Sequence, residues 1–152
     1  MTRDRVLLLT AAGAGAAGLA VSGYLTAVHS ASAPLVCPAT ATVDCERVLS
    51  SPYGVLPGSA VPTSAAGVAW FAISLVLVGL LFRHPASAPL RRLLVGWAAL
   101  GLISVLYLVF IEVVVIGAIC AWCTAVHVLV LAFFLVALVR WLSFEPKWQS
   151  PT

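Results

Sequence analysis

Apolar residues run along this chain in four long stretches, and polar and charged residues gather between them. The stretches cover about residues 6–28, 64–82, 93–116 and 119–141. Each is close to the ~20 residues that an α-helix needs to cross the hydrocarbon core of a bilayer. The pattern predicts an all-α membrane protein of one domain, 1–152, whose four transmembrane helices leave a sizeable loop at 29–63 and a tail at 142–152.

The composition agrees with a membrane protein. Of the 152 residues, 62% are hydrophobic and 9% are charged, whereas a soluble domain is about half apolar and about a quarter charged. The net charge of +3 is not concentrated in one basic surface, so we expect no nucleic-acid partner.

Basic residues indicate the orientation, because Lys and Arg accumulate in short cytoplasmic loops. Seven of the eight basic residues fall on one side of the four spans: Arg3, Arg5, Arg83, Arg91, Arg92, Arg140 and Lys147. Only Arg47 lies in the long loop. We therefore expect a multi-pass protein of the cell membrane with both termini in the cytoplasm and the loop outside.

The first apolar stretch has a second interpretation, a cleaved signal peptide. The small residues Ala31-Ser32-Ala33 before Pro34 resemble a cleavage site. The stretch is longer than a usual signal-peptide core, however, and Ala11, Ala14, Gly15 and Gly18 are spaced for close helix packing. We favour a retained helix.

Four cysteines carry the candidate chemistry, in two close pairs. Cys37 and Cys45 lie in the proline-rich loop, and Cys120 and Cys123 form a Cys-Ala-Trp-Cys motif where the fourth helix should begin. A helix N-terminus favours thiolate, and a second sulfur lies one turn away. The motif predicts dithiol/disulfide exchange on the outer face of the membrane.

Other roles for the cysteines stay open at this point. The loop pair would make a structural staple, although so short a loop contributes only roughly 2.5 kcal/mol. Cys120 and Cys123 would be inert buried residues, or zinc ligands together with His127, which shares their helix face. Metal alone would leave the loop pair unexplained, so we expect no metal site.

The loop should be partly helical. Its five prolines forbid a long helix, but residues 44–50 have room for one or two turns, with Asp44 as the N-cap.

Several segments together resemble the bacterial branch of the vitamin K epoxide reductase family. They are Cys37, the sequence Asp-Cys-Glu-Arg-Val-Leu-Ser-Ser-Pro-Tyr-Gly at 44–54, the run 107–112, and Ile-Gly-Ala-Ile-Cys-Ala-Trp-Cys-Thr-Ala-Val-His at 116–127. The order of the loop pair, the Ser-Ser motif and the Cys-x-x-Cys motif makes the resemblance specific, and it covers nearly the whole chain.

The resemblance implies a four-helix bundle around a quinone of menaquinone or ubiquinone type. It also implies oxidation of a thioredoxin-fold protein, similar to DsbA, that makes disulfides in exported proteins. Carried over to this sequence, Cys123 is the sulfur nearest the quinone and Cys120 is its partner. Cys45 exchanges with Cys120, and Cys37 meets the external thiol. Ser51 and Trp70 match positions at the quinone pocket.

The sequence departs from the family pattern in three places. The chain contains no Asn to match the quinone-binding Asn of animal enzymes, and Thr63 and Ser64 are the nearest polar substitutes. His127 stands where those enzymes carry Tyr, so epoxide reduction is not implied. Little sequence follows the fourth span, so the thioredoxin-fold partner should be a separate protein.

Two polar residues inside the expected spans are further candidates for the quinone site. Glu112 is costly in lipid and by default marks a function, and His127 could hydrogen-bond a quinone oxygen or carry its proton. A packing role is the alternative for each. Two other kinds of protein also compete with an enzyme: a small four-helix transporter or binding protein with a structural loop disulfide, and an assembly subunit.

Overall fold

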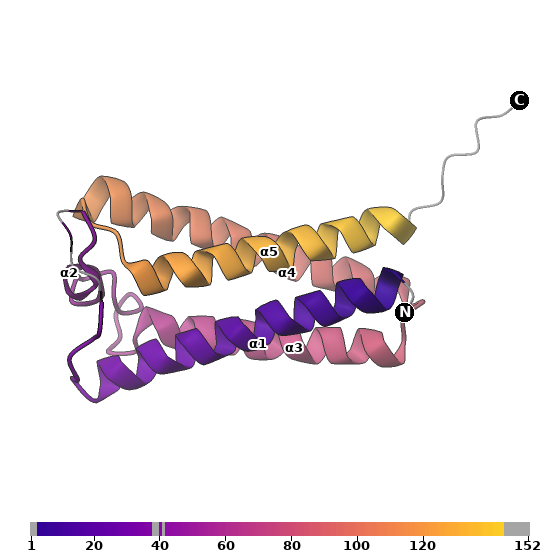
Figure 1. The fold of residues 1–152 in the computed structure, drawn as a ribbon, viewed down its shortest axis with the longest axis horizontal. Coiled ribbons are helices and arrows are strands. Elements are labelled where there is room, and N and C mark those ends of the chain that lie inside the picture. Colours follow the sequence, from indigo (N-terminus) through magenta and orange to yellow (C-terminus); the bar gives the residue numbers. More distant parts are fainter. Residues whose placement is uncertain (1–2, 38–39, 41, 145–152) are drawn as a thin grey trace, which may run out of the picture.

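The computed structural model describes residues 3–37, 40 and 42–144, and every regular element in that part of the chain is a helix. The elements are α1 (Arg3–Ser30), α2 (Cys45–Leu49), α3 (Thr63–Arg83), α4 (Ala88–Phe110), the π-helix η1 (Ile111–Ile116) and α5 (Ala121–Phe144). Four helices are long and apolar enough to cross a membrane, because η1 continues α4 into one span, Ala88–Ile116. The prediction of an all-α protein with four membrane helices is confirmed, and the long helices lie side by side in a bundle (Figure 1).

The helix bounds differ from the apolar stretches. α1 begins at Arg3 rather than near residue 6, and α4 begins at Ala88 rather than near 93. Arg91 and Arg92, which lie between the second and third apolar stretches, belong to the first turns of α4. A helix can extend past the hydrocarbon core while its charged turns stay in the polar boundary. Lys147 and residues 145–152 of the expected tail lie outside the described residues.

Close packing between α1 and α3 depends on small residues. Ala11, Gly15 and Gly18 of α1 are buried, and a Cβ atom on Gly18 would overlap the ring of Phe71 on α3. Small residues let helix backbones approach where lipid provides no hydrophobic driving force. The sequence-based interpretation of this stripe is confirmed, and α1 packs against both α3 and α5.

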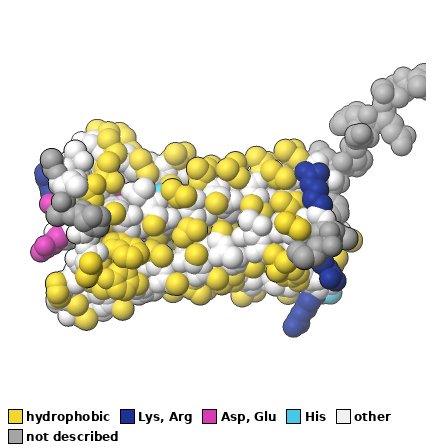
Figure 2. All heavy atoms as spheres, viewed as in Figure 1, with side chains coloured by type: hydrophobic (Ala, Val, Ile, Leu, Met, Phe, Trp, Pro, Cys, Tyr) yellow, Lys and Arg dark blue, Asp and Glu magenta, His cyan; other side chains and the backbone are white. Residues whose placement is uncertain are grey.

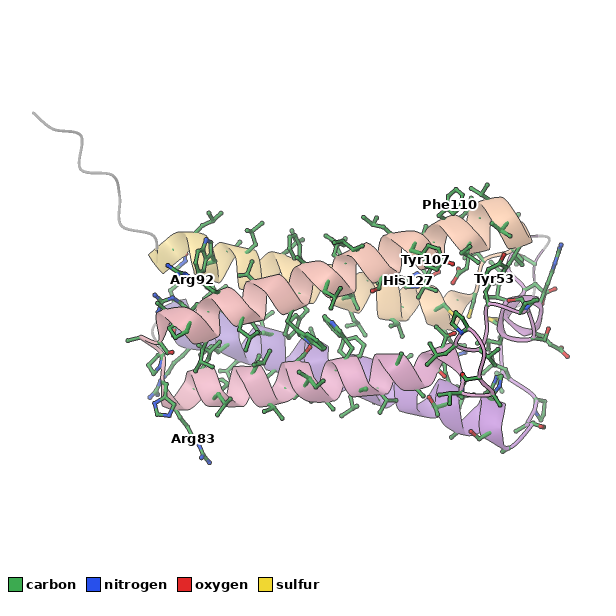
Figure 3. The ribbon with its side chains drawn as sticks, turned by 180° about the vertical axis from the view of Figure 1, so that it is seen from behind. Tyr53, Arg83, Arg92, Tyr107, Phe110 and His127 are labelled. Carbon is green, nitrogen blue, oxygen red and sulfur yellow. A yellow bond between two sulfur atoms is a disulfide. The ribbon has the colours of Figure 1, made fainter. Side chains whose placement is uncertain are left out.

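The two ends of the bundle differ in the charge of their side chains. Dark-blue Arg side chains gather at the end that holds the start of α1, and acidic side chains appear at the end that holds α2 (Figure 2). Arg83 and Arg92 project from the first of these ends (Figure 3). Between the ends, the visible sides are mainly apolar (Figure 2), as expected for a surface that faces lipid.

One of the basic residues, Arg140, forms an internal ion pair. Arg140 of α5 is only 2% exposed, and its Nε donates to Oδ1 of Asp4 on α1 at 2.7 Å. Its Nη2 donates to the Pro85 carbonyl between α3 and α4 at 3.2 Å. Arg140 therefore joins α1, α5 and the α3–α4 turn at the end of the bundle opposite α2.

Candidate redox site

The short helix α2 positions the second loop cysteine. Asp44 is its N-cap, and Oδ1 accepts a hydrogen bond from the Arg47 backbone N–H at 2.9 Å. This satisfies one of the unpaired N–H groups of the first turn. The predicted helical turn and its cap are confirmed, and the turn buries Cys45 and Val48 against the bundle mouth.

The two loop cysteines form a disulfide, with Cα atoms 6.2 Å apart. Cys45 is 1% exposed, whereas Cys37 is only partly buried. Of the two sulfurs, Cys37 is therefore the one more open to a reagent from outside the bundle.

The loop docks on the segment that leads into α5. Asp44 N–H donates to the Ile119 carbonyl, and Ile119 N–H donates to the Thr42 carbonyl, both at 3.0 Å, in a parallel bridge between Val43 and Ile119. Cys45 and Cys120 follow this bridge by two residues and one residue. The bridge thus brings together two cysteines that lie 75 positions apart in the sequence.

A second contact comes from the motif itself. Nε1 of Trp122 donates to the Val36 carbonyl at 2.9 Å, next to Cys37. Its ring also lies against Tyr24 of α1, with ring centroids 5.2 Å apart. Trp122 therefore holds the chain before Cys37 against the start of α5 and the end of α1.

All four cysteines meet in one small cluster. Its buried members are Cys45, Val48, Ala118 and Cys120, and Cys37 and Cys123 pack against them. Cys120 and Cys123 are free thiols, with Cys120 buried and Cys123 partly buried. The site thus holds one disulfide and one dithiol in contact, which is the arrangement that thiol–disulfide exchange requires.

Cys120 occupies the N-cap position of α5. Its Sγ accepts a hydrogen bond from the Cys123 backbone N–H at 3.2 Å. A hydrogen bond from the Cys123 side chain, helped by backbone N–H groups, lowers the pKa of Cys120, against burial and the nearby Glu112 carboxylate, which raise it. Cys120 is thereby the sulfur of this pair that is more readily ionised.

The π-helix η1 directs the Glu112 side chain toward the cysteine site. The carboxyl is 6% exposed, and Oε2 accepts the Cys120 backbone N–H at 3.3 Å. Gly117 ends η1 with φ 69°, a conformation that glycine adopts without strain. π-Helical turns occur frequently at functional sites.

His127 lies one turn beyond Cys123 and toward the α2 end of the bundle (Figure 3). It is 8% exposed, and its imidazole makes no hydrogen bond to any other described residue. An imidazole with unused hydrogen-bonding capacity fits a quinone oxygen, which needs a donor. The role of His127 at a quinone stays a prediction.

Ser51 and Trp70, the other two predicted pocket residues, each contact other parts of the protein. Ser51 Oγ donates to the Val48 carbonyl at 2.7 Å, directly behind the cysteine cluster. Trp70 stacks on Trp97 and meets Phe133, six residues beyond His127, so it lies deeper in the bundle. The structure thus brings Glu112 to the cysteines, while the quinone roles of Ser51 and Trp70 stay predictions.

Thr63 and Ser64, the polar substitutes for the missing Asn, are also engaged. Thr63 Oγ1 donates to the Tyr53 carbonyl, and Ser64 Oγ accepts from Thr26 of α1, both at 2.9 Å. These bonds fasten the start of α3 to the loop and to α1.

A family model described as the vitamin K epoxide reductase family matches residues 9–138. The chain belongs to this family. Membership implies a membrane thiol–disulfide oxidoreductase that uses a quinone as electron acceptor, and family proteins usually work with thioredoxin-like partners. The comparison with curated proteins gives no significant match.

Sequence reasoning missed the residues that dock the loop. In the sequence, Trp122 is one of the two residues between the cysteines of the Cys-x-x-Cys motif, and no motif marks Val43 or Ile119. An indole at a membrane boundary usually finds a hydrogen-bond partner, which was an available signal for Trp122. No local pattern predicts which carbonyl it would reach, or which loop residue pairs with Ile119.

Proposed function

We propose that this protein oxidises a separate thioredoxin-fold protein by a four-cysteine relay and passes the electrons to a quinone, so that exported proteins acquire disulfides. The whole chain acts as one domain in this proposal. The observation that carries it is the contact between the oxidised loop pair and the reduced Cys120/Cys123 pair, with Cys45 and Cys120 as the buried sulfurs at their junction.

The relay follows from accessibility. A thiolate of the partner attacks Cys37, the more accessible loop sulfur, and releases Cys45 as a thiolate. The second thiol of the partner then resolves the mixed disulfide and leaves the loop pair reduced. Cys45 next attacks Cys120 of an oxidised helix pair and releases Cys123, and Cys37 displaces Cys120 to restore the loop disulfide. Two electrons have then moved from the partner to Cys120 and Cys123.

The acceptor site lies beside Cys123. His127 would hold one quinone oxygen, and the predicted lining residues Ser51, Trp70 and Glu112 complete the proposed pocket. A bound quinone supplies the oxidising power, because it takes up two electrons and two protons. The Cys123 side chain is partly buried and packs against the buried cysteine cluster, which limits its contact with water.

Purified protein in lipid nanodiscs should oxidise a reduced thioredoxin-fold protein only when a quinone is present. Loss of free thiols and bleaching of the quinone measure the two half-reactions separately. Activity without quinone, or none with either a benzoquinone or a naphthoquinone, would reject the proposed function.

Replacing His127 by Ala is expected to slow quinone-dependent oxidation of the helix pair roughly tenfold, the worth of about one hydrogen bond in a buried site. Thiol exchange with the partner should keep its rate, because His127 lies beyond the cysteine cluster. Rapid-mixing measurement of each half-reaction tests this, with Val128→Ala, a change at a lipid-facing neighbour that is 59% exposed, as control. Equal quinone rates in the two variants would make His127 a packing residue.

The proposed orientation places the α2 end outside and the basic end in the cytoplasm. Reporter fusions after Phe82 and Trp141 should then be active on the cytoplasmic side, and one near Gly58 on the outer side. The reason is the gathering of basic residues at one end of the bundle. An external reporter after Trp141 would put the cysteines in the reducing compartment and contradict the proposal.

A further inference from the structure

Glu112 is a carboxyl that contacts both halves of the Cys120/Cys123 pair. Oε2 accepts the Cys120 backbone N–H at 3.3 Å, and the Cys123 side chain lies close to the same carboxyl. The side chain is 6% exposed. A carboxyl in such a place is costly unless it is paired or serves the chemistry.

Helix capping accounts for only part of this arrangement. The Cys120 N–H is one of the donors that α5 leaves unpaired at its N-terminus, and a neutral amide would accept it equally well. The approach of the Cys123 thiol needs another explanation. That thiol must lose a proton whenever the pair is oxidised, and Glu112 is the ionisable oxygen that lies beside it.

We propose that Glu112 accepts the proton of the Cys123 thiol when the Cys120/Cys123 pair is oxidised, a role that rests on the proposed function. While the pair is reduced, the Cys120 N–H and the nearby Cys123 thiol favour the charged carboxylate and oppose burial, which favours the neutral acid. When the disulfide forms, the S–H donor is lost, and burial then favours the neutral acid.

Atoms and electrons balance in this step, which starts from the reduced pair. The Cys123 S–H bond breaks and an O–H bond forms on Glu112, the proton of Cys120 leaves to water at the bundle mouth, and the two sulfurs join. Two electrons leave to an oxidant of the quinone class, which the proposed function supplies. The transfer lets the buried sulfur react without first sending its proton through the apolar bundle.

Other ionisable groups near Glu112 have to be held constant in a test. These groups lie on the elements that pack against Glu112 and on its own helix. They are Cys45, Glu46, Arg47, Tyr107, Cys120, Cys123 and His127. Glu46, Arg47 and Tyr107 are exposed, and Cys45 is bound in the disulfide. Glu46, Arg47, Tyr107 and His127 are unchanged in every chain that the test compares.

The test counts protons at equilibrium and uses no quinone. In the full chain with Cys37→Ala and Cys45→Ala, the helix pair alone is titrated against dithiothreitol buffers at several pH values, and alkylation reports the disulfide fraction. The dithiothreitol couple takes up both protons that an ordinary dithiol pair releases, so the equilibrium constant in the Glu112→Gln chain should not change with pH. In the chain that keeps Glu112 it should fall about tenfold per pH unit, because one of the two protons stays on the carboxyl. Glu112→Asp should keep this dependence.

Equal pH dependence in the chain that keeps Glu112 and in the Glu112→Gln chain would overturn the proposal and leave Glu112 as a helix cap. An infrared difference spectrum of the chain that keeps Glu112 provides a second measurement if the Glu112→Gln variant fails to fold. The carbonyl band of a protonated carboxyl should appear on oxidation, and its absence would also overturn the proposal. A positive result together with no quinone reduction would reject the proposed function alone. A pair that forms no disulfide would reject both.

Discussion

A chain carrying Cys123→Ser is expected to accumulate a disulfide between Cys45 and Cys120 and to lose quinone-linked turnover, on the order of 10³-fold or more. Cys120 and Cys45 are buried members of the same small cluster, and the lowered pKa of Cys120 makes it the competent nucleophile. Its thiolate attacks Cys45 and releases Cys37 as a thiol. Without Cys123, no neighbouring sulfur on the helix resolves the new bridge. Acid quenching, alkylation and mass spectrometry identify the disulfide.

The complementary variant is Cys37→Ala. It should abolish oxidation of the partner to the same extent, because the accessible sulfur is gone, while the Cys120/Cys123 pair keeps its reaction with quinone. Tyr53→Phe, a change at an exposed loop residue, is the matched control and should retain both half-reactions. A Cys37–Cys120 bridge in the Cys123→Ser chain would mean that the two loop cysteines have exchanged roles.

Replacing Asp4 by Ala is expected to destabilise the bundle by about 3 kcal/mol, at the lower end of the range for breaking a buried ion pair because Asp4 is 22% exposed. The change removes the Asp4 carboxylate from the Arg140 guanidinium, which is 2% exposed. Thermal unfolding in detergent should show a midpoint roughly 6–12 °C lower. The effect should be on stability, since the pair lies at the end of the bundle opposite the cysteines.

Two further chains separate the ion pair from a general loss of charge. The double variant with Asp4→Ala and Arg140→Met should recover most of the stability, because replacing a whole buried pair by apolar side chains is often neutral. Arg92→Met removes an exposed basic residue from the same end and should stay within about 0.5 kcal/mol of the parent. A double variant as unstable as Asp4→Ala alone would contradict this account.

Local chemistry explains why so much of the site is predictable from sequence. Asp44 caps α2 because a carboxylate three residues before an N–H is the strongest N-terminal signal a short helix has. Gly18 permits contact with Phe71 because a small residue leaves room for a ring on the facing helix. The Cys-x-x-Cys spacing likewise places the Cys123 N–H over the Cys120 sulfur within one turn of α5.

Contacts between distant segments were not predictable in this way. Basic residues suggested only a membrane orientation, yet Arg140 is enclosed by Asp4 and the Pro85 carbonyl, which depends on how α1, α5 and the α3–α4 turn meet. Glu112 is a candidate for the quinone site from its sequence position alone, and the contact of its carboxyl with the Cys120 N–H comes from the π-helical turn of η1. A one-residue change in helical register rotates the direction of every later side chain, and no local sequence pattern predicts that change.

The four membrane helices, the capped helical turn and the two cysteine pairs follow from local sequence, because each depends on residues within one or two turns of each other. That Cys45 and Cys120 share one buried cluster is visible only in the folded bundle. This arrangement depends on the Val43–Ile119 bridge and on the bond from Trp122 to Val36, which join a proline-rich loop to a helix start about 80 residues away. Backbone hydrogen bonds carry no side-chain signature, so their partners are fixed only when the bundle closes.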